Sequence, residues 1–378
     1  MSRRGLVGIA GVAAAAACLA VCAPAGAHAG VPPRFLGVNY AFYPYVPKED
    51  AARMASGGVG TARFGLEWFH VERQRGTYDW SDSDKTIGNL ASRGIEPIPV
   101  LFGTPYWATQ EPIIQPPIDL PILFPFTNGT AYPPNDTAEG AAGWSNFVKA
   151  AARRYGPGGS FWRGPYRRSH HSAAPVPVRT WQVWNEPNIG YYFWPQPSVA
   201  KYAGLVQLTH AAITRVDPGA KLALGGLPCR AEYSCTKFLR DLYTHSGIAH
   251  DFDLVAIHPY APSVDYMLKE LRSARRVVDR HGSPRTRIWV SEFGWGSKPP
   301  RSHYNEGLRG QARMLKQSFA ALVHRRRSLG LEGLSWFDWR DAAEEQPSCS
   351  WCAHAGLFTS GGKAKPSWRA FKRAARRG

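Results

Sequence analysis

Two short segments, far apart in the chain, each place a glutamate directly after an apolar run. The first, WQVWNEPN at 181–188, contains Glu186, and the second, WVSEFGW at 289–295, contains Glu292. Burying an ionised carboxylate among tryptophans costs free energy, so a pair of such glutamates requires a chemical reason. For one such glutamate alone, a surface or helix-capping role would be the better interpretation. The pair favours a site in which one carboxyl group keeps its proton and the other loses it.

The elements that must position these glutamates alternate regularly along the chain. Eight short apolar runs are predicted strands, at 35–39, 61–66, 96–102, 179–184, 221–225, 254–257, 287–290 and 333–337. Amphipathic helical patterns between them include 82–92, 141–155, 198–216, 263–281 and 305–327. This α/β alternation predicts a parallel sheet, and eight such units predict a single (β/α)8 barrel. Both glutamates then lie at the C-terminal mouth of the barrel, after the fourth and seventh strands.

An open, doubly wound sheet is the structural alternative to the barrel. Such sheets commonly bind dinucleotides through a GxGxxG turn after an early strand. This chain has no such turn there, so a dinucleotide site has no support.

The glutamate segments resemble the clan A retaining glycoside hydrolases, barrel families that include cellulases and β-xylosidases. The resemblance spans nearly the whole chain after residue 30. It rests on WNEPN and SEFGW, and on further residues that fit the pattern: Arg63 and Trp68 in the second unit, GTPYWA at 103–108 with Trp107, His258-Pro259-Tyr260, and Trp336. The resemblance implies that Glu186 is the acid/base and Glu292 the nucleophile. Their carboxyl groups would then lie about 5–5.5 Å apart, and no cofactor would be needed.

The same resemblance suggests roles for polar neighbours of the glutamates. Asn185 would bind the sugar 2-hydroxyl, and Arg63 with Tyr260 would help to keep Glu292 ionised. Arg63 could instead be a structural ion-pair partner inside the barrel. His258 would either bind substrate or brace the end of the sixth strand.

Aromatic residues are the other expected sugar contacts. By the family's pattern, Trp336 is a stacking platform under a sugar ring, and Trp68 also belongs to the expected substrate-binding set. Trp107 and Trp339 could bind substrate or pack in the core, and Trp295 would pack beneath the site.

One gap between predicted strands is unusually long, from Phe102 to Arg179, and within it only 141–155 has a helical pattern. The loop Thr104–Pro134 carries eight prolines and several aromatic residues. A loop of this length is either functional or disordered. Its aromatic content favours an ordered flap over the active site, and a decorative insertion is the alternative.

The N-terminal segment has the pattern of a secretory signal peptide over 1–29. Arg3 and Arg4 precede an apolar run, and the small residues of AHA at 27–29 suit signal peptidase. A retained membrane anchor and a lipoprotein anchored at Cys22 are the alternatives. We therefore expect a secreted catalytic domain over 30–378.

After removal of that segment, four cysteines remain. In an oxidising compartment, an even number of cysteines at short spacing predicts two local disulfides, Cys229–Cys235 and Cys349–Cys352. Zinc ligation by the same cysteines is the lesser alternative.

Composition limits the remaining function classes. The chain has 378 residues, of which 44% are hydrophobic and 20% charged, and this excludes disorder, collagen and a small disulfide scaffold. The net charge is +18, and the excess basic residues are expected on solvated faces. Weak adhesion to an anionic wall polymer or DNA is an alternative, but no specific nucleic-acid site is expected. No metal site is expected, because the adjacent His170 and His171 lack a third ligand at a suitable spacing.

The sequence therefore predicts a secreted, monomeric, retaining hydrolase of β-linked carbohydrate. A transglycosylase on the same scaffold, a non-catalytic carbohydrate-binding barrel and a basic wall- or nucleic-acid-binding protein are the alternatives. The sugar, the linkage and the choice between endo and exo action are not encoded in any motif.

Overall fold

In the computed structural model the chain divides into two units, Met1–Gly30 and Val31–Gly378. The structure describes Met1 and residues 31–109, 129–170, 172–282, 285–298, 302–344 and 349–376. Apart from Met1, the predicted signal peptide over 1–29 lies outside the described residues.

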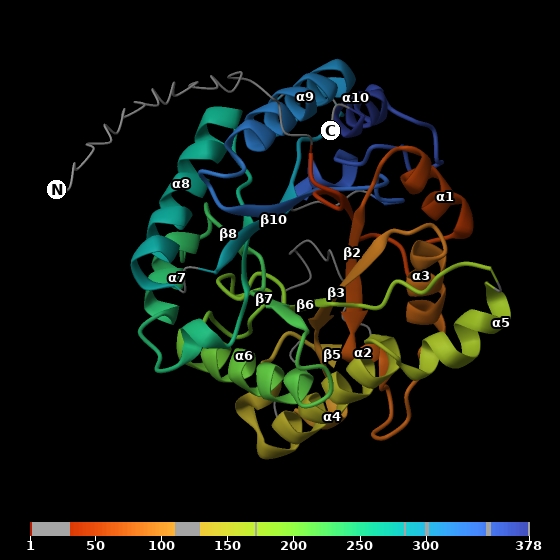
Figure 1. The fold of residues 1–378 in the computed structure, drawn as a ribbon, viewed down its shortest axis with the longest axis vertical. Coiled ribbons are helices and arrows are strands. Elements are labelled where there is room, and N and C mark those ends of the chain that lie inside the picture. The colour runs from red at the N-terminus through yellow and green to blue at the C-terminus, as the bar shows by residue number, and fades with distance from the viewer. Residues whose placement is uncertain are drawn as a thin grey trace. The chain divides into compact units, whose positions relative to one another are not determined.

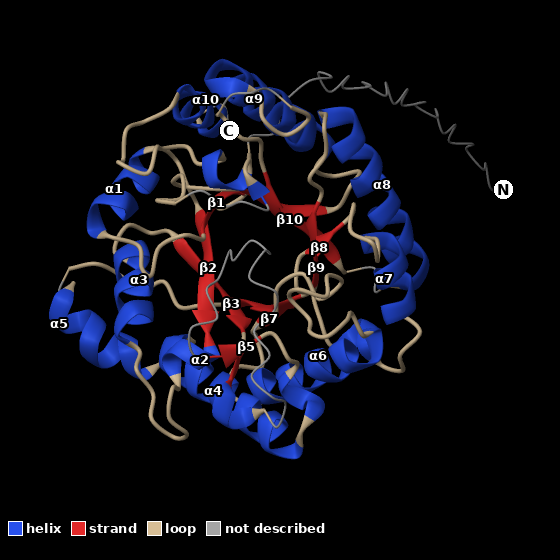
Figure 2. Cartoon of the chain, turned by 180° about the vertical axis from the view of Figure 1, so that it is seen from behind, coloured by secondary structure: helices blue, strands red, loops and turns tan. Residues whose placement is uncertain are grey.

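A closed barrel of eight parallel strands forms the centre of the second unit (Figure 2). In order around the barrel, the strands are β1 (Leu36–Tyr40), β2 (Thr61–Glu67), β3 (Glu96–Phe102), β6 (Thr180–Val183), β7 (Lys221–Ala223), β9 (Leu254–His258), β10 (Arg287–Phe293) and β11 (Leu331–Trp336). β11 pairs with β1 and closes the barrel. The predicted (β/α)8 barrel is confirmed, and the open sheet is excluded.

Helices form a ring around the strands (Figure 1). They are α1 (Lys48–Ser56), α2 (Trp68–Val71), α3 (Ser81–Ala91), α4 (Ala138–Tyr155), α5 (Arg167–Ser169), α6 (Val199–Thr214), α7 (Cys235–Leu242), α8 (Val264–His281), α9 (Gly307–Arg325) and α10 (Pro366–Ala375). The expected helices are confirmed with shifted ends. In the long gap after Phe102, the sequence predicts helix only over 141–155. The structure corrects this, because a π-helical turn, η3 (Trp162–Tyr166), and the short helix α5 follow α4 there.

Alternation along the strands separates the helix-facing core from the barrel interior. Along β9, Val255 and Ile257 belong to the large core under the helices, whereas Leu254 and Ala256 belong to a small separate cluster. His258 continues the alternate face of Leu254 and Ala256. The strand pattern therefore directs the imidazole into the barrel.

Strand β10 departs from this regular alternation at its end. It was predicted to stop at Val290 but continues to Phe293, and its pairing with β11 shifts register between Val290 and Phe293. Val290 and Phe293 both belong to the helix-facing core. An irregularity of this kind redirects side chains, and here it accompanies an inward Glu292.

Both predicted disulfides are present, Cys229–Cys235 and Cys349–Cys352. The first closes a loop that follows the short strand β8 (Leu227–Pro228), and the second joins Cys349 to the first residue of the 3-10 turn η6 (Cys352–His354). Among the described residues, no helix combines the length and apolar character that crossing a membrane requires.

The long loop after β3 is pinned at its base. Short strands β4 (Thr104–Pro105) and β5 (Gly129–Thr130) pair in antiparallel fashion. The Thr104 hydroxyl also donates to the Tyr132 carbonyl oxygen at 2.6 Å. The central part of the predicted flap, 110–128, lies outside the described residues.

Candidate active site

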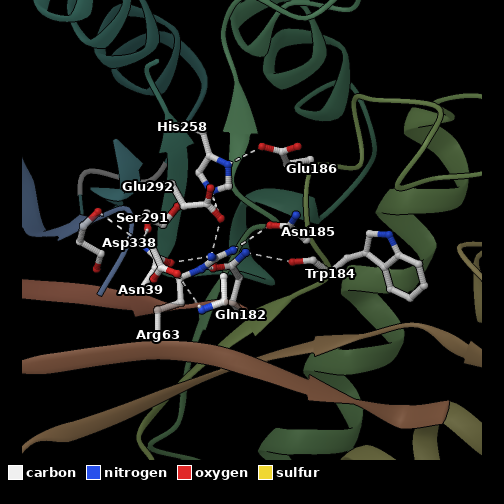
Figure 3. A network of polar contacts seen from close by, with 12 residues as sticks. Asn39, Arg63, Gln182, Trp184, Asn185, Glu186, His258, Ser291, Glu292 and Asp338 are labelled. Atoms are coloured by element: carbon white, nitrogen blue, oxygen red, sulfur yellow. Dashed lines mark hydrogen bonds and ion pairs between the residues drawn. The ribbon is translucent and has the colours of Figure 1, made fainter. Parts of the chain in front are cut away.

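The two glutamates singled out from the sequence lie on either side of His258 (Figure 3). An oxygen of Glu186, an oxygen of Glu292 and a nitrogen of His258 all lie within 4.8 Å of one another. The glutamates are buried, with 7% and 5% of their surfaces exposed. Glu186 and Glu292, which lie more than 100 positions apart in the chain, therefore form one compact polar centre with His258.

Both oxygens of Glu292 accept hydrogen bonds. Arg63 donates from Nη1 to Oε1 at 2.5 Å, and the Tyr260 hydroxyl donates to Oε2 at 2.7 Å. Burial and the charge of Glu292 raise the pKa of Tyr260, so its hydroxyl keeps the proton that it donates. A cation and a donor hydroxyl on separate oxygens stabilise a carboxylate here.

Arg63 is itself fixed by three buried amide side chains. Its Nε donates to Gln182 Oε1 at 2.8 Å, and Nη1 also donates to Asn39 Oδ1 at 2.8 Å. Its Nη2 donates to Asn185 Oδ1 at 2.7 Å. The guanidinium is therefore held in one orientation toward Glu292, and the Asn185 oxygen is occupied while its amide nitrogen remains a donor.

Glu186 has a different environment. Burial, and then the charge of Glu292, raise its pKa well above that of a free glutamate, with Arg63 acting in the opposite direction. Its Oε1 lies 2.7 Å from His258 Nδ1. Burial and the positive charge of Arg63 lower the pKa of His258 well below its usual value, so the imidazole is neutral. Two carboxyl groups with opposed environments are the arrangement that acid and base roles need.

The backbone that carries Glu186 adopts an unusual conformation. Trp184 has φ 69° and Glu186 has φ 45°, both in the left-handed region that non-glycine residues rarely adopt. The Glu186 N–H donates to the Gly225 carbonyl oxygen at 2.5 Å. Gly226, with φ 57°, allows close approach, since a Cβ there would lie 2.2 Å from His258 Nε2. Such conformations cluster at functional sites, where the surroundings hold them in place.

An aromatic group borders the Glu292 side of the site. The Tyr260 ring lies 4.9 Å from that of Trp351 and 6.2 Å from that of Phe337, between ring centroids. Phe337 also contacts Phe42, and Trp351 stacks with Tyr304. These rings come from loops after four different strands and meet next to the residue that donates to Glu292.

The structure corrects the expectation for Trp336. Its indole is fully buried, contacts Phe293 and Phe319 of α9, and donates from Nε1 to the Ala355 carbonyl oxygen. A residue packed against an outer helix cannot lie under a sugar ring in this conformation. Phe337, one position further along the chain, has its ring on the Tyr260 side. Trp336 and Phe337 lie at the same strand end, but neighbouring side chains point in opposite directions.

Trp68 is the second correction. It is fully buried, packs against Trp144 and Phe147 of α4, and donates from Nε1 to Glu72 at 2.6 Å. Trp68 is therefore a core residue at the start of α2. Trp107 packs beside it and stays partly exposed, so its expected role in binding remains a prediction.

Trp295 and Trp339, two further tryptophans singled out from the sequence, are buried. Trp295 donates to the Ala261 carbonyl oxygen and packs against Trp336, which fits its expected position beneath the site. Trp339 packs against Phe358 and Trp368, so it is a core residue. His258 meets both glutamates, and the alternative of a purely structural brace for its strand does not describe those contacts.

Sequence reasoning missed four residues of this site, Asn39, Gln182, Phe337 and Asp338. Asn39 and Gln182 are polar residues within apolar runs, a signal that could have identified them. Asp338 is a buried carboxyl group that accepts from the Trp339 and Ala41 N–H groups, and burial raises its pKa. Only the three-dimensional structure brings it near Glu292.

Glu186, His258 and Glu292 are also the described residues whose atoms could together ligate a metal ion. The cationic guanidinium of Arg63 already binds Glu292, and positive charge at that point opposes a divalent cation. The donor set therefore suits proton transfer. Of the two adjacent histidines, His170 stacks on Tyr166, and His171 lies outside the described residues.

Sequence similarity relates part of this chain to part of a known protein. No family model matches it. The β-xylosidase of Caldicellulosiruptor saccharolyticus is 27% identical over 210 residues, which are 52% of this chain and 41% of that relative. The chain therefore matches less than half of the relative's length.

Solved structures extend the similarity to nearly the whole chain. A family 39 glycoside hydrolase from Bacteroides cellulosilyticus WH2 has a TM-score of 0.63 at 20% identity, covering 91% of this chain and 63% of that one. A monomeric β-xylosidase from Caulobacter crescentus CB15 has a TM-score of 0.65 at 19% identity, covering 91% and 68%. The GH5_18 protein from Streptomyces cattleya, in complex with GlcNAc, has a TM-score of 0.62 at 16% identity, covering 92% and 80%. These similarities show that the chain shares the barrel fold of clan A glycoside hydrolases.

Proposed function

We propose that this chain is a secreted retaining glycosidase that hydrolyses β-linked O-glycosidic bonds by double displacement. Glu186 is the acid/base and Glu292 the nucleophile. One observation carries the proposal: oxygens of the two carboxyl groups lie within 4.8 Å of each other, beside a neutral histidine and a bound arginine. Retaining enzymes need about 5–5.5 Å between these groups, whereas inverting enzymes need about 6.5–9.5 Å to admit a water.

In the first step, a Glu292 oxygen attacks the anomeric carbon of the sugar. The bond from that carbon to the leaving oxygen breaks, and the leaving oxygen takes the proton of Glu186. The raised pKa of Glu186 keeps this proton available. The hydrogen bond from Arg63 holds the Glu292 carboxyl group in a fixed orientation. The products are a glycosyl ester on Glu292 and a Glu186 carboxylate.

In the second step, Glu186 acts as a base. Esterification removes the charge of Glu292, which is one cause of the raised pKa of Glu186, so Glu186 stays ionised until it receives a proton from water. The water oxygen attacks the anomeric carbon, and Glu292 leaves as a carboxylate. The proton ends on Glu186, and both residues return to their starting states.

The substrate contact proposed for Asn185 follows from its hydrogen bonds. Its oxygen accepts from Arg63, so its amide nitrogen is left to donate to a sugar 2-hydroxyl. That contact strengthens in the oxocarbenium-like transition state of this reaction class.

Secretion is part of the proposal. It is supported by the N-terminal sequence pattern and by two disulfides, which persist in oxidising compartments. A monomeric state is favoured because a structure similar to this chain is described as monomeric. Xylosides are the first substrates to try, because the relative and two of the solved structures are named β-xylosidases.

The decisive experiment is labelling with a panel of activated 2-deoxy-2-fluoro glycosides, including xylosides, glucosides, mannosides and galactosides. Peptide mass mapping should find the sugar on Glu292, and unlabelled protein across the panel, together with no release of sugar from polysaccharides, would contradict the proposal. A transglycosylase would also be labelled, and adding a sugar acceptor separates it by its products. A non-catalytic binding barrel would be neither labelled nor active.

A further inference from the structure

Gln182 connects two parts of the site's hydrogen-bond network, the Arg63 side chain and the Trp184 main chain (Figure 3). It belongs to β6, and its side chain is fully buried. Trp181 and Val183, its neighbours in the strand, belong to the helix-facing core, so alternation directs Gln182 into the barrel. An amide at this position would be costly to bury unless both its ends were bonded.

Both ends are bonded. Gln182 Oε1 accepts from Arg63 Nε at 2.8 Å, and Gln182 Nε2 donates to the Trp184 carbonyl oxygen at 3.0 Å. The first contact orients the guanidinium that donates to Glu292. The second fixes the left-handed backbone two residues before Glu186. The Gln182 amide therefore connects Arg63, which binds Glu292, to the main chain that leads to Glu186.

We propose that Gln182 is a positioning residue that sets the placement of Glu186 and the charge seen by Glu292. The inference rests on the proposed glycosidase function. Within the described part of the chain, Arg63 donates to three neutral amide oxygens and to one carboxylate, that of Glu292. The neutrality of residue 182 leaves the full charge of Arg63 to the nucleophile.

A carboxylate at position 182 would change both contacts. Gln182→Glu keeps the shape of the side chain and the acceptor for Arg63, but it removes the donor to the Trp184 carbonyl oxygen. It also adds a second negative charge at the guanidinium, which makes ionisation of Glu292 harder. If Gln182 were merely structural, a charge added at this position would not change the pH dependence of the reaction.

The test compares the pH dependence of kcat/KM for the full chain and for Q182E, using a glycoside that the wild type hydrolyses. The acid limb should move to higher pH, because a second negative charge then competes with Glu292 for the charge of Arg63. Gln182→Met, which removes both contacts without adding charge, should leave the acid limb in place and lower kcat by about 10- to 100-fold through misplacement of Glu186.

Gln311 provides a matched control. It is a fully buried amide on α9 whose Nε2 donates to the Trp295 and Ala355 carbonyl oxygens and whose Oε1 accepts from Ser367. Q311E and Q311M should lower thermal stability as the Gln182 variants do, but with little change in the pH profile or in kcat of the folded protein.

The outcomes separate the two proposals. An active wild type with unchanged limbs in Q182E and unchanged kcat in Q182M contradicts the role of Gln182 alone. The same holds if the Gln311 variants lose as much kcat as those at Gln182. A wild type that neither hydrolyses nor becomes labelled by any glycoside contradicts the proposed function instead. If Q182E does not fold, the kcat of Q182M decides.

Discussion

His258 Nδ1 lies 2.7 Å from Glu186 Oε1, with both side chains buried. The pKa of Glu186 is raised, chiefly by burial, and the pKa of His258 is lowered, also chiefly by burial. The shared proton therefore resides on the carboxyl group, which donates to the imidazole nitrogen. The other ring nitrogen, Nε2, lies 3.5 Å from Glu292 Oε1. A neutral histidine thus lies between the protonated carboxyl group of Glu186 and the carboxyl group of Glu292 that Arg63 binds.

This proton assignment predicts the basic limb of the pH profile. The raised pKa means that Glu186 keeps its proton at pH values where a free glutamate has lost it, so kcat/KM should fall only well above about pH 4.3. Glu186→Gln should lower kcat/KM by about 10²- to 10⁴-fold for substrates with poor leaving groups and should remove this limb. A basic limb that survives in the variant would assign the acid to another residue.

The same shift predicts a pH-dependent stability difference. Above about pH 4.3 an unfolded chain releases the proton of Glu186 while the folded chain retains it, so ionisation opposes folding as pH rises toward the folded-state pKa. Glu186→Gln lacks this loss. Its free energy of unfolding should therefore exceed that of the wild type by a margin that grows with pH, measured by urea unfolding at several pH values. A margin that shrinks with rising pH would contradict the raised pKa.

The fold could be predicted from the sequence because apolar runs and helical patterns are local features. The two catalytic candidates, Glu186 and Glu292, lie in short motifs that could also be recognised locally. Side-chain direction was harder, since it depends on strand alternation and on the register shift near the end of β10. The family's pattern indicates Trp336 for the site, whereas the ring that contacts Tyr260 is that of Phe337.

The remaining site residues depend on contacts across the barrel. Asn39 donates from Nδ2 to the carbonyl oxygens of Ser291, Ser335 and Trp336, on strands more than 250 positions away. No local pattern encodes such pairings. The role of the loop 104–134 also stays a prediction, because only its two ends are described.

Substitutions at the neighbouring positions 336 and 337 test which of the two side chains faces the site. Phe337→Ala should lower kcat/KM by about 2- to 10-fold, the size of one aromatic contact, and because Phe337 is 2% exposed it should also lower the free energy of unfolding. Trp336→Phe should reduce the free energy of unfolding by about 0.5–3 kcal/mol but leave kcat/KM nearly unchanged, because Trp336 packs between β10 and α9. Steady-state kinetics and thermal unfolding of both variants decide, and the reverse pattern would restore the original expectation for Trp336.

The two disulfides should contribute about equally to the stability of the protein but should differ in their effect on activity. Each closes a short loop and is expected to contribute about 2 kcal/mol. Trp351, held between Cys349 and Cys352, packs on Tyr260, which donates to Glu292. Replacing both of these cysteines by serine should therefore lower kcat as well as Tm.

The Cys229–Cys235 pair is the matched control for that variant. Its loop is anchored independently, because Asn188 Nδ2 donates to the Pro228 and Tyr233 carbonyl oxygens. The double serine variant at 229 and 235 should lower Tm similarly but retain most of kcat. Equal kcat in the two variants would show that Trp351 does not support Tyr260. Thiol titration of denatured, unreduced wild type should find almost no free thiol at these four cysteines.

Azide rescue should assign the two glutamates by the stereochemistry of the product. Glu292→Ala should lose activity by orders of magnitude, because no nucleophile lies beneath the anomeric carbon. Azide can occupy the space left by the side chain and attack directly, so a β-glycoside should give an α-glycosyl azide. In Glu186→Ala, a substrate with an activated leaving group still forms the ester on Glu292, and azide then attacks that ester to give a β-glycosyl azide. Nuclear magnetic resonance of the products distinguishes the anomers. If the two variants exchange products, the roles of Glu186 and Glu292 are reversed, and wild-type rates in either variant would remove that residue from the mechanism.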